Sequence, residues 1–266
     1  MAKKIVVTNQ KGGVGKTTTA HNIAALLALK GRRVLAIDLC TQANLSISFG
    51  IDITAVKNSI REVLMGQCPI EDAVVHKYEN LDIIPARKDL ETIASIAEIA
   101  ANPHKAELLK VYLHKAGDLE QSYDYMMIDT GPAVQSLLTM NGLTAADYYL
   151  IPTLFDMFAV TGLGELLVIM QQLRNNWQNR NIKNAGILGT FYRNTRNSRY
   201  FEDMVVGRSP YGKDVLSARI RQNVALSSCV KEGLPITLYD KSSHGYHDYN
   251  AATDELIAKI EGPLNA

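Results

Sequence analysis

The sequence predicts an α/β fold in which a mostly parallel, doubly wound sheet carries helices on both faces. Short β-rich runs alternate with segments of helical spacing along nearly the whole chain, and several of these runs are continuously apolar. Such alternation produces βαβ units with right-handed crossovers. Continuous apolar runs are what strands covered on both faces require. A glycine-rich loop between the first strand and the first helix indicates where such a sheet would bind a ligand.

The first predicted strand, Lys4–Thr8, ends at this loop. The helix that follows, Thr17–Lys30, has apolar residues at helical spacing and stops at Gly31, which suits the residue after a helix. The other predicted strands are Arg33–Leu39, Leu81–Pro85, Tyr125–Asp129, Asp147–Pro152, Gly186–Phe191 and Asp214–Ile220. The other predicted helices are Ser59–Met65, Asp89–Ala100, Lys105–Ala116, Thr161–Asn176, Ser198–Val206 and Asn250–Ile260.

Length and composition indicate one large globular domain over residues 1–266. A chain of 266 residues suits a single α/β domain better than two small ones, and no internal repeat or Pro/Gly/Ser linker divides it. The formal net charge is only +1, so any binding of nucleic acid has to come from a local basic patch.

The cysteines and the N-terminus favour a cytoplasmic protein. Cys40, Cys68 and Cys229 are far apart and odd in number, which fits neither a disulfide framework nor a zinc site. The N-terminal residues MAKKIVVT enter a strand directly, without the apolar stretch of a signal peptide. No apolar run approaches the roughly 18 residues that read as a membrane-spanning helix. We therefore expect no membrane span.

The sharpest motif is NQKGGVGKTT, between the first strand and the first helix. Its glycines let the backbone curl so that several N–H groups point at phosphate oxygens, and the start of the helix adds partial positive charge. In such a loop Lys16 reaches the β- and γ-phosphates and the Thr17 hydroxyl ligates Mg²⁺. ATP and Mg²⁺ are the expected cofactors. The predicted nucleotide-binding residues are Lys11, Gly12, Gly13, Val14, Gly15, Lys16, Thr17 and Thr18.

This loop resembles the deviant Walker A box shared by the ParA/Soj partition ATPases, the MinD division-site ATPases and nitrogenase iron protein. The strict pattern GxxxxGK[ST] fails because Gln10 stands where the first glycine belongs, while Lys11 adds a second lysine. The resemblance implies that Lys11 crosses a dimer interface to the partner's nucleotide, so that ATP joins two copies in a sandwich. A buried triphosphate with Mg²⁺ needs such additional cations to offset its charge.

Asp38, at the end of a predicted strand, would face the phosphates across the sheet edge and hold a Mg²⁺-bound water, although a strand-end Asp also serves as a turn cap. The following LCTQANLS resembles the family's first switch segment, LDPQGNLS. The family has there a second Asp, assigned to the attacking water, where this chain has Cys40, and a Pro where it has Thr41. A thiol is mostly neutral and bonds weakly. We expect ATP binding and dimerisation to be retained, with hydrolysis slow or its water positioned by another group.

Asp129 closes YDYMMIDTGP, which resembles the family's Walker B strand, with Gly131 in place of the first of two prolines. Its carboxylate would hold a Mg²⁺-bound water or fix the hydroxyl of Thr17, unless it caps the next turn. The predicted metal-binding residues are therefore Thr17 directly and Asp38 and Asp129 through water. The predicted catalytic residues are Lys11, Lys16, Asp38, Cys40 as the departure from the family, and Asp129.

Three further segments favour the ParA/Soj branch. They are IPTLFDMFAVTGLGELL, GILGTFYRNTRNS and the closing LPITLYDKSSHGYHDYNAATDELI, which resemble ParA/Soj segments and occur in the right order. Nitrogenase iron protein needs cysteines for its cluster, and the loop after Asp129 has none. The tail ELIAKIEGPLNA has one lysine and a Gly-Pro break, so it makes a poor MinD-like membrane anchor.

Basic residues of the C-terminal third are candidates for DNA contact. The resemblance implies non-specific DNA binding by an ATP dimer, which depends on phosphate contacts and weakens with salt. The candidates are Arg193, Arg196 and Arg199, with Tyr192 and Tyr200 between them, and Arg219 and Arg221; Lys213, Lys231 and Lys241 lie in the same third. In ARIRQNVAL the family's DNA-contacting arginines fall on Gln222 and Ala225, so Arg219 and Arg221 are offered only as neighbouring substitutes.

The combined interpretation is an ATPase of the ParA/Soj type that serves plasmid or chromosome partition. ATP and Mg²⁺ would drive a homodimer that binds double-stranded DNA on the nucleoid, and a ParB-like partner would stimulate hydrolysis and release it. Three alternatives stay open at this point: an ATP-binding switch that hardly hydrolyses, a MinD-like positioning ATPase for membrane or protein cargo, and a small-molecule P-loop enzyme such as a synthetase or kinase.

Overall fold

The computed structural model describes residues 1–175 and 179–262, apart from the side chains of residues 158–160. Within these residues one eight-stranded sheet has the strand order β3-β4-β2-β5-β1-β6-β7-β8. All neighbouring strands are parallel except β3 and β4, which are antiparallel. The strands are β1 (Lys3–Val7), β2 (Val34–Leu39), β3 (Val75–Tyr78), β4 (Leu81–Ile84), β5 (Tyr125–Thr130), β6 (Tyr148–Thr153), β7 (Lys183–Tyr192) and β8 (Val215–Arg221). The predicted α/β fold with a mostly parallel sheet is confirmed.

Helices and short helical turns connect the strands. The α-helices are α1 (Lys16–Leu29), α2 (Asn44–Ser48), α3 (Ile60–Leu64), α4 (Ala97–Ala101), α5 (Leu108–Lys115), α6 (Gly117–Ser122), α7 (Leu137–Ala145), α8 (Met157–Asn175), α9 (Arg196–Asp203), α10 (Val224–Lys231), α11 (Ile236–Tyr239) and α12 (His244–Glu261). The 3₁₀ turns are η1 (Ile70–Ala73), η2 (Lys88–Ser95), η3 (Lys105–Glu107) and η5 (Gly212–Asp214), and η4 (Met204–Arg208) is a π-turn.

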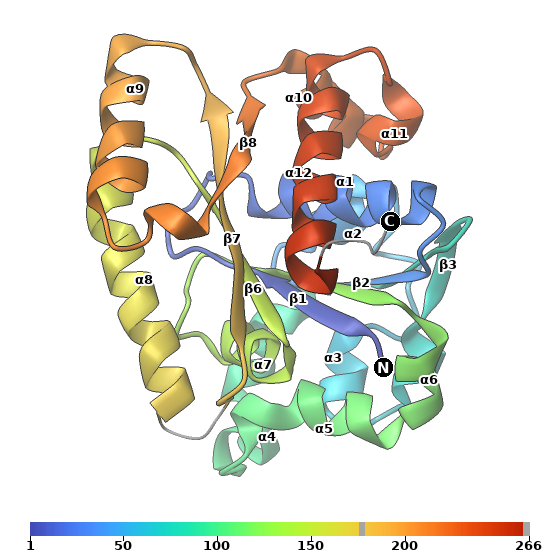
Figure 1. Ribbon diagram of the computed structural model, residues 1–266. Coiled ribbons are helices and arrows are strands. Elements are labelled where there is room, and N and C mark those ends of the chain that lie inside the picture. The colour runs from blue at the N-terminus through green and yellow to red at the C-terminus, as the bar shows by residue number, and fades with distance from the viewer. Residues whose placement is uncertain (176–178, 263–266) are drawn as a thin grey trace.

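The sheet separates two hydrophobic cores (Figure 1). On one face α1, α2, α10, α11 and α12 pack through residues such as Leu26, Phe49 and Tyr249. On the other face α3, α5, α7 and α8 pack through residues such as Leu109 and Leu166. The strands between the two layers are almost wholly buried: every residue of β2 and of β5 is inaccessible to solvent or nearly so. This confirms the prediction of helices on both faces, while the extent of a single domain over residues 1–266 stays a prediction.

Several elements differ from the sequence-based expectation. The helix predicted for Asp89–Ala100 is wrong: the segment forms the 3₁₀ turn η2 and the short α4. Its apolar residues Leu90, Ile93, Ile96 and Ile99 recur every third position, which matches the three residues per turn of a 3₁₀ helix. The edge strand β3 and the helices α2, α6, α7, α10 and α11 were not predicted. The predicted end of a helix at Asn176 lies outside the described residues.

Candidate nucleotide-binding site

The glycine-rich loop follows β1 and is anchored to the neighbouring strand β6. The side-chain amide of Asn9 donates to the carbonyl of Pro152 at 2.8 Å, and its oxygen accepts the backbone N–H of Lys11 at 2.9 Å. Gly13 and Gly15 have φ values of 72° and 80°, in the left-handed region that favours glycine. Gly15 is the N-cap of α1, so the helix begins at Lys16, directly after the loop.

Lys16 folds back over the loop that precedes it. Its ammonium group donates to the carbonyl of Lys11 at 3.0 Å, and the residue is only 7% exposed. Burial lowers the pKa of Lys16, against the attraction of Asp129. The cation is therefore held inside the curl of the loop, where it can meet a phosphate without first being ordered.

Asp129 is fully buried beside the start of α1. The Thr17 hydroxyl donates to its Oδ2 at 2.7 Å, whereas the buried Oδ1 has no hydrogen-bond partner within the described residues. Burial raises the pKa of Asp129, and the neighbouring Asp38 raises it further. A buried carboxylate oxygen without a donor is costly. A hard cation or its bound water would satisfy it, so the donor set of hydroxyl and carboxylate oxygens fits Mg²⁺.

Asp38 lies opposite Asp129 in the register of β2 and β5 and is also fully buried. Its Oδ1 accepts from the backbone N–H of Cys40 at 2.9 Å, and its Oδ2 accepts from the N–H and the hydroxyl of Ser46 at 2.8 and 2.7 Å. Burial raises the pKa of Asp38, while these bonds lower it. The thiol of Cys40 is 5% exposed, and burial together with the charge of Asp129 raises its pKa to about 11. At neutral pH it is an uncharged thiol.

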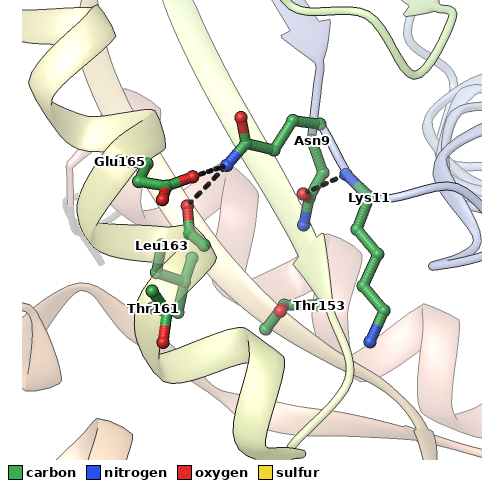
Figure 2. Close-up of a pocket in the computed structure, with 8 residues that line it drawn as sticks. Asn9, Lys11, Thr153, Thr161, Leu163 and Glu165 are labelled. Carbon is green, nitrogen blue, oxygen red and sulfur yellow. Dashed lines mark hydrogen bonds between the residues drawn. The ribbon is translucent and has the colours of Figure 1, made fainter.

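Lys11 stands at the mouth of a pocket of about 450 Å³ beside the loop (Figure 2). Its ammonium group pairs with Asp156 Oδ2 at 2.5 Å, and both side chains are 35% exposed. On the opposite wall the Gln10 amide donates to Glu165 at 2.8 Å. Lys11 is thus bound in cis by a carboxylate that precedes α8, and it does not lie with Lys16 in the curl of the loop.

A second pocket, of about 210 Å³, adjoins the other end of the loop and was not predicted. It begins at Gly15 and Thr18 and is lined from the far side by residues of β7, β8, α10 and α12. These include Phe191, Asn223, Leu226, Val230 and Tyr249. No local motif marks this set, because the residues meet only when three segments of the C-terminal third converge on α1.

The basic residues proposed for DNA contact have different surroundings. Arg193, Arg196 and Arg199 are exposed in and before α9, and Tyr200 beside them is 55% exposed. Arg221 makes a bidentate ion pair with Asp248, at 2.6 Å for the closest contact. Lys213, Lys231 and Lys241 are also exposed.

Arg219 is turned inward. It pairs with Glu202 at 2.8 Å, its guanidinium carbon lies 5.0 Å from the centre of the Phe155 ring, and its side chain is 17% exposed. Its charge is thus paired within the protein, so a contact of Arg219 with DNA would have to compete with Glu202.

Comparison with known proteins identifies the family. A family model described as an AAA domain matches residues 2–184. Over 258 residues the chain is 34% identical to the chromosome partitioning protein ParA of Caulobacter vibrioides. The aligned residues cover 96% of this chain and 94% of that protein. The chain belongs to the ParA/Soj family of partition ATPases. The family inferred from the phosphate loop and the switch segments is thereby confirmed.

Two further relatives of this ParA/Soj chain are informative. It is 35% identical over 260 residues to the sporulation initiation inhibitor protein Soj of Bacillus subtilis, covering 97% of this chain and 99% of that one. Among solved structures it is similar to a cobyrinic acid a,c-diamide synthase of Mycobacterium smegmatis with a bound ATP analogue and magnesium. There the TM-score is 0.84, with 30% identity and coverage of 99% and 97%. No described helix is both long and apolar enough to cross a membrane.

Proposed function

We propose that this ParA/Soj protein is an ATP-dependent dimerising switch that binds DNA without sequence preference and serves partition of a plasmid or chromosome. The observation that carries the proposal is the preformed phosphate cradle: Lys16 is bonded to the loop carbonyl of Lys11, and Thr17 is bonded to the buried Asp129. A lysine and a hydroxyl at the start of a helix that follows a glycine-rich loop are the groups that recognise a triphosphate and its metal ion.

The nucleotide would lie along the loop with its base in the pocket next to Gly15 and Thr18. That pocket's volume of about 210 Å³ and its lining by Phe191, Leu226 and Val230 suit a flat, largely apolar ring. Asn223 also lines this pocket, and its side-chain amide would hydrogen-bond to the edge of the ring. The phosphates would then lie between Lys16 and the two buried carboxylates.

Magnesium bound at this site would neutralise phosphate charge during hydrolysis. The residues that would hold it are Thr17, through its hydroxyl, and Asp129 and Asp38, through water. Asp129 already has a buried oxygen without a donor, which a bound water satisfies. Asp38 is held rigidly by Ser46 and Cys40, so its carboxylate is oriented before the nucleotide arrives.

Dimerisation would transfer Lys11 from Asp156 to the partner's nucleotide. Because the ion pair between Lys11 and Asp156 is partly exposed, it contributes only about 0–1 kcal/mol and holds Lys11 weakly. A triphosphate offers Lys11 a stronger anion than one carboxylate does. ATP, with more phosphate charge than ADP, would favour the dimer, and this couples assembly to the state of the nucleotide.

The dimer would bind DNA through phosphate contacts. Arg193, Arg196 and Arg199 form an exposed basic set with Tyr200, and two copies of such a set bind more tightly than one. The monomer's net charge of +1 gives little long-range attraction. A ParB-like protein would stimulate hydrolysis and release the dimer. The protein would be cytoplasmic and associate with the nucleoid when ATP is bound.

A nearly hydrolysis-dead switch is favoured by the neutral thiol of Cys40, which cannot act as a carboxylate does. Single-turnover hydrolysis that neither DNA nor partner accelerates would support it. A small-molecule enzyme is favoured by the pocket beside Lys11 and by the likeness to the diamide synthase. In that case a Lys11→Ala variant would remain active as a monomer. A MinD-like role would require ATP-dependent pelleting with liposomes.

Molar mass in solution tests the dimer part of the proposal. We expect a monomer without nucleotide and with ADP·Mg²⁺, and a dimer with ATP·Mg²⁺, measured by size-exclusion chromatography with light scattering. Lys11→Ala should bind ATP and stay monomeric, whereas Lys183→Ala, which removes an exposed lysine at the start of β7 and so at the opposite sheet edge from the loop, should dimerise normally. A monomer in every state of the unaltered protein would contradict the proposal.

A further inference from the structure

Helix α9 carries two arginines of the exposed basic set and lies at the periphery of the molecule (Figure 1). Every residue of this helix is exposed or half-buried. Phe201 packs against one of the hydrophobic cores, but the rest of the helix gains little from burial. A helix of eight residues is also too short to be stable by its own hydrogen bonds. The position of its arginines therefore depends on specific polar contacts with the sheet.

Glu202, near the end of α9, uses both carboxylate oxygens for such contacts. Its Oε1 accepts from Arg219 Nε at 2.8 Å, and its Oε2 accepts from the Tyr192 hydroxyl at 3.0 Å. Tyr192 ends β7 and Arg219 lies in β8, so one side chain joins the helix to two adjacent strands. The side chains of Glu202 and Arg219 are 24% and 17% exposed. Salt therefore screens this ion pair less than a pair on the open surface.

Arg219, the partner of Glu202 in β8, is itself held in place from several sides. Its Nη1 donates to two backbone carbonyls of its own strand. Its guanidinium carbon lies 5.0 Å from the centre of the Phe155 ring. Gly189 in β7 leaves room for both side chains, because a Cβ there would collide with the Phe155 ring and lie 2.8 Å from Arg219 Cδ. Glu202 is thus bonded to a part of the packed sheet.

We propose that Glu202 is the positioning residue of the DNA-binding helix. By docking α9 on the sheet, it fixes Arg196 and Arg199 before DNA arrives. These arginines are three positions apart and so are neighbours on the helix surface. Cations that are fixed in advance lose less conformational freedom on binding phosphates than cations on a loose helix do. The inference rests on the proposed DNA binding and names a residue that controls it.

Neutralising two adjacent carboxylates of α9 tests the inference by the sign of the effect. Asp203, the control, is 58% exposed and pairs with Arg208 at the surface. With ATP·Mg²⁺ and a short duplex of arbitrary sequence, Asp203→Asn should bind DNA slightly more tightly than wild type, because it removes a negative charge. Glu202→Gln removes the same charge, yet it should bind about tenfold or more weakly, because α9 loses its ion pair with the sheet. Its affinity should also depend less steeply on salt as phosphate contacts are lost.

Two further measurements separate docking from charge and from folding. In an Arg219→Gln background the ion pair is already lost, so Glu202→Gln should no longer weaken DNA binding. Hydrogen exchange without DNA is an independent readout. The amides of α9 should exchange faster in Glu202→Gln than in wild type or Asp203→Asn, while the amides of α1 stay equally protected in all three proteins.

The outcomes distinguish the inference from the function on which it rests. DNA binding by Glu202→Gln that equals or exceeds that of Asp203→Asn would overturn the role of Glu202 and leave the DNA-binding switch standing. Unchanged exchange of the α9 amides, or a loss of ATP-dependent dimerisation in Glu202→Gln, would overturn it as well. Absence of DNA binding by the wild-type protein with ATP·Mg²⁺ would instead refute the proposed function, and the inference with it.

Discussion

Single residues of the phosphate cradle carry charge that protein interiors normally exclude. Asp38 and Asp129 are fully buried and Lys16 nearly so. Burial raises the pKa of each carboxyl and lowers that of the amine, so each group is less stable in its charged form than in water. The negative charge of a bound triphosphate would stabilise the ammonium form of Lys16, and the positive charge of Mg²⁺ would stabilise the two carboxylates. Buried ionisable groups of this kind are typical of functional sites.

His21 is a buried base outside the cradle. It packs edge-on against Phe49 at 4.3 Å between ring centroids, and neither ring nitrogen has a hydrogen-bond partner in the described structure. Burial lowers its pKa to about 3 from the ordinary 6.5. Between these values the unfolded chain binds the proton and the folded protein does not. The contribution of His21 to stability is therefore complete above pH 6.5 and is lost as the pH falls toward 3.

Replacing His21 should flatten this dependence. Between pH 6.5 and pH 4 the wild-type protein should lose more free energy of unfolding than His21→Phe does. The difference should be on the order of a few kcal/mol, measured by urea unfolding. The comparison between variants matters because Asp38 and Asp129, whose pKa values are raised, act with the opposite sign in the same range. His114→Gln, at an exposed histidine, is the matched control and should follow wild type. Parallel curves for wild type and His21→Phe would refute the assignment.

Asp156 restrains Lys11 before the dimer forms. Asp156→Asn removes the negative charge at nearly constant shape, so Lys11 is freed to reach the partner's phosphates. Because both side chains are 35% exposed and the pair is worth about 0–1 kcal/mol, the ATP-bound dimer should tighten only a few-fold. Sedimentation with ATP·Mg²⁺ measures this dissociation constant. A weaker dimer in Asp156→Asn would show that the carboxylate orients Lys11 rather than restraining it.

Individual elements differ in how readily the sequence predicts them. The strands β1, β2 and β5 are continuous apolar runs, and α1 follows a phosphate loop, so their positions were predicted within a few residues. Helix α7 was missed because its nine residues contain Gly142 and several threonine and asparagine positions of low helix propensity. Its glycine has a packing reason that only the structure shows: the helix lies directly against three side chains of the sheet.

Alanine substitutions at two helical glycines should change the stability in opposite directions. A Cβ on Gly142 would lie 3.2 Å from Leu39 and Val6 and 3.3 Å from Ile128, so Gly142→Ala should destabilise by about 1 kcal/mol or more through overpacking. Gly164 in α8 has nothing within 4 Å of that position. Gly164→Ala should therefore stabilise by about 0.5–1 kcal/mol, because alanine favours a helix. Thermal unfolding without nucleotide measures both, and the same sign for the two changes would contradict this packing.

At the scale of the whole molecule, the sheet gathers the predicted site residues at one edge. Asp38 and Asp129 are adjacent in register, and Val7, at the end of β1, pairs with Asp129. The sequence motifs predicted this convergence because parallel strands present their carboxyl ends together. The pocket beside Gly15 could not be predicted, since it needs β7, β8, α10 and α12 to meet α1. Nor could the inward turn of Arg219, which depends on Glu202 and Phe155 in other elements.

Binding to arbitrary double-stranded DNA at low salt tests the central claim most directly, because it joins the nucleotide, the dimer and the basic set of each copy in one observation. The protein should bind with ATP·Mg²⁺, bind weakly with ADP·Mg²⁺ or no nucleotide, lose affinity steeply as salt is raised, and fail to bind as Lys11→Ala. DNA binding that is equal in all nucleotide states, or that survives in Lys11→Ala, would contradict a switch that works through an ATP-dependent dimer.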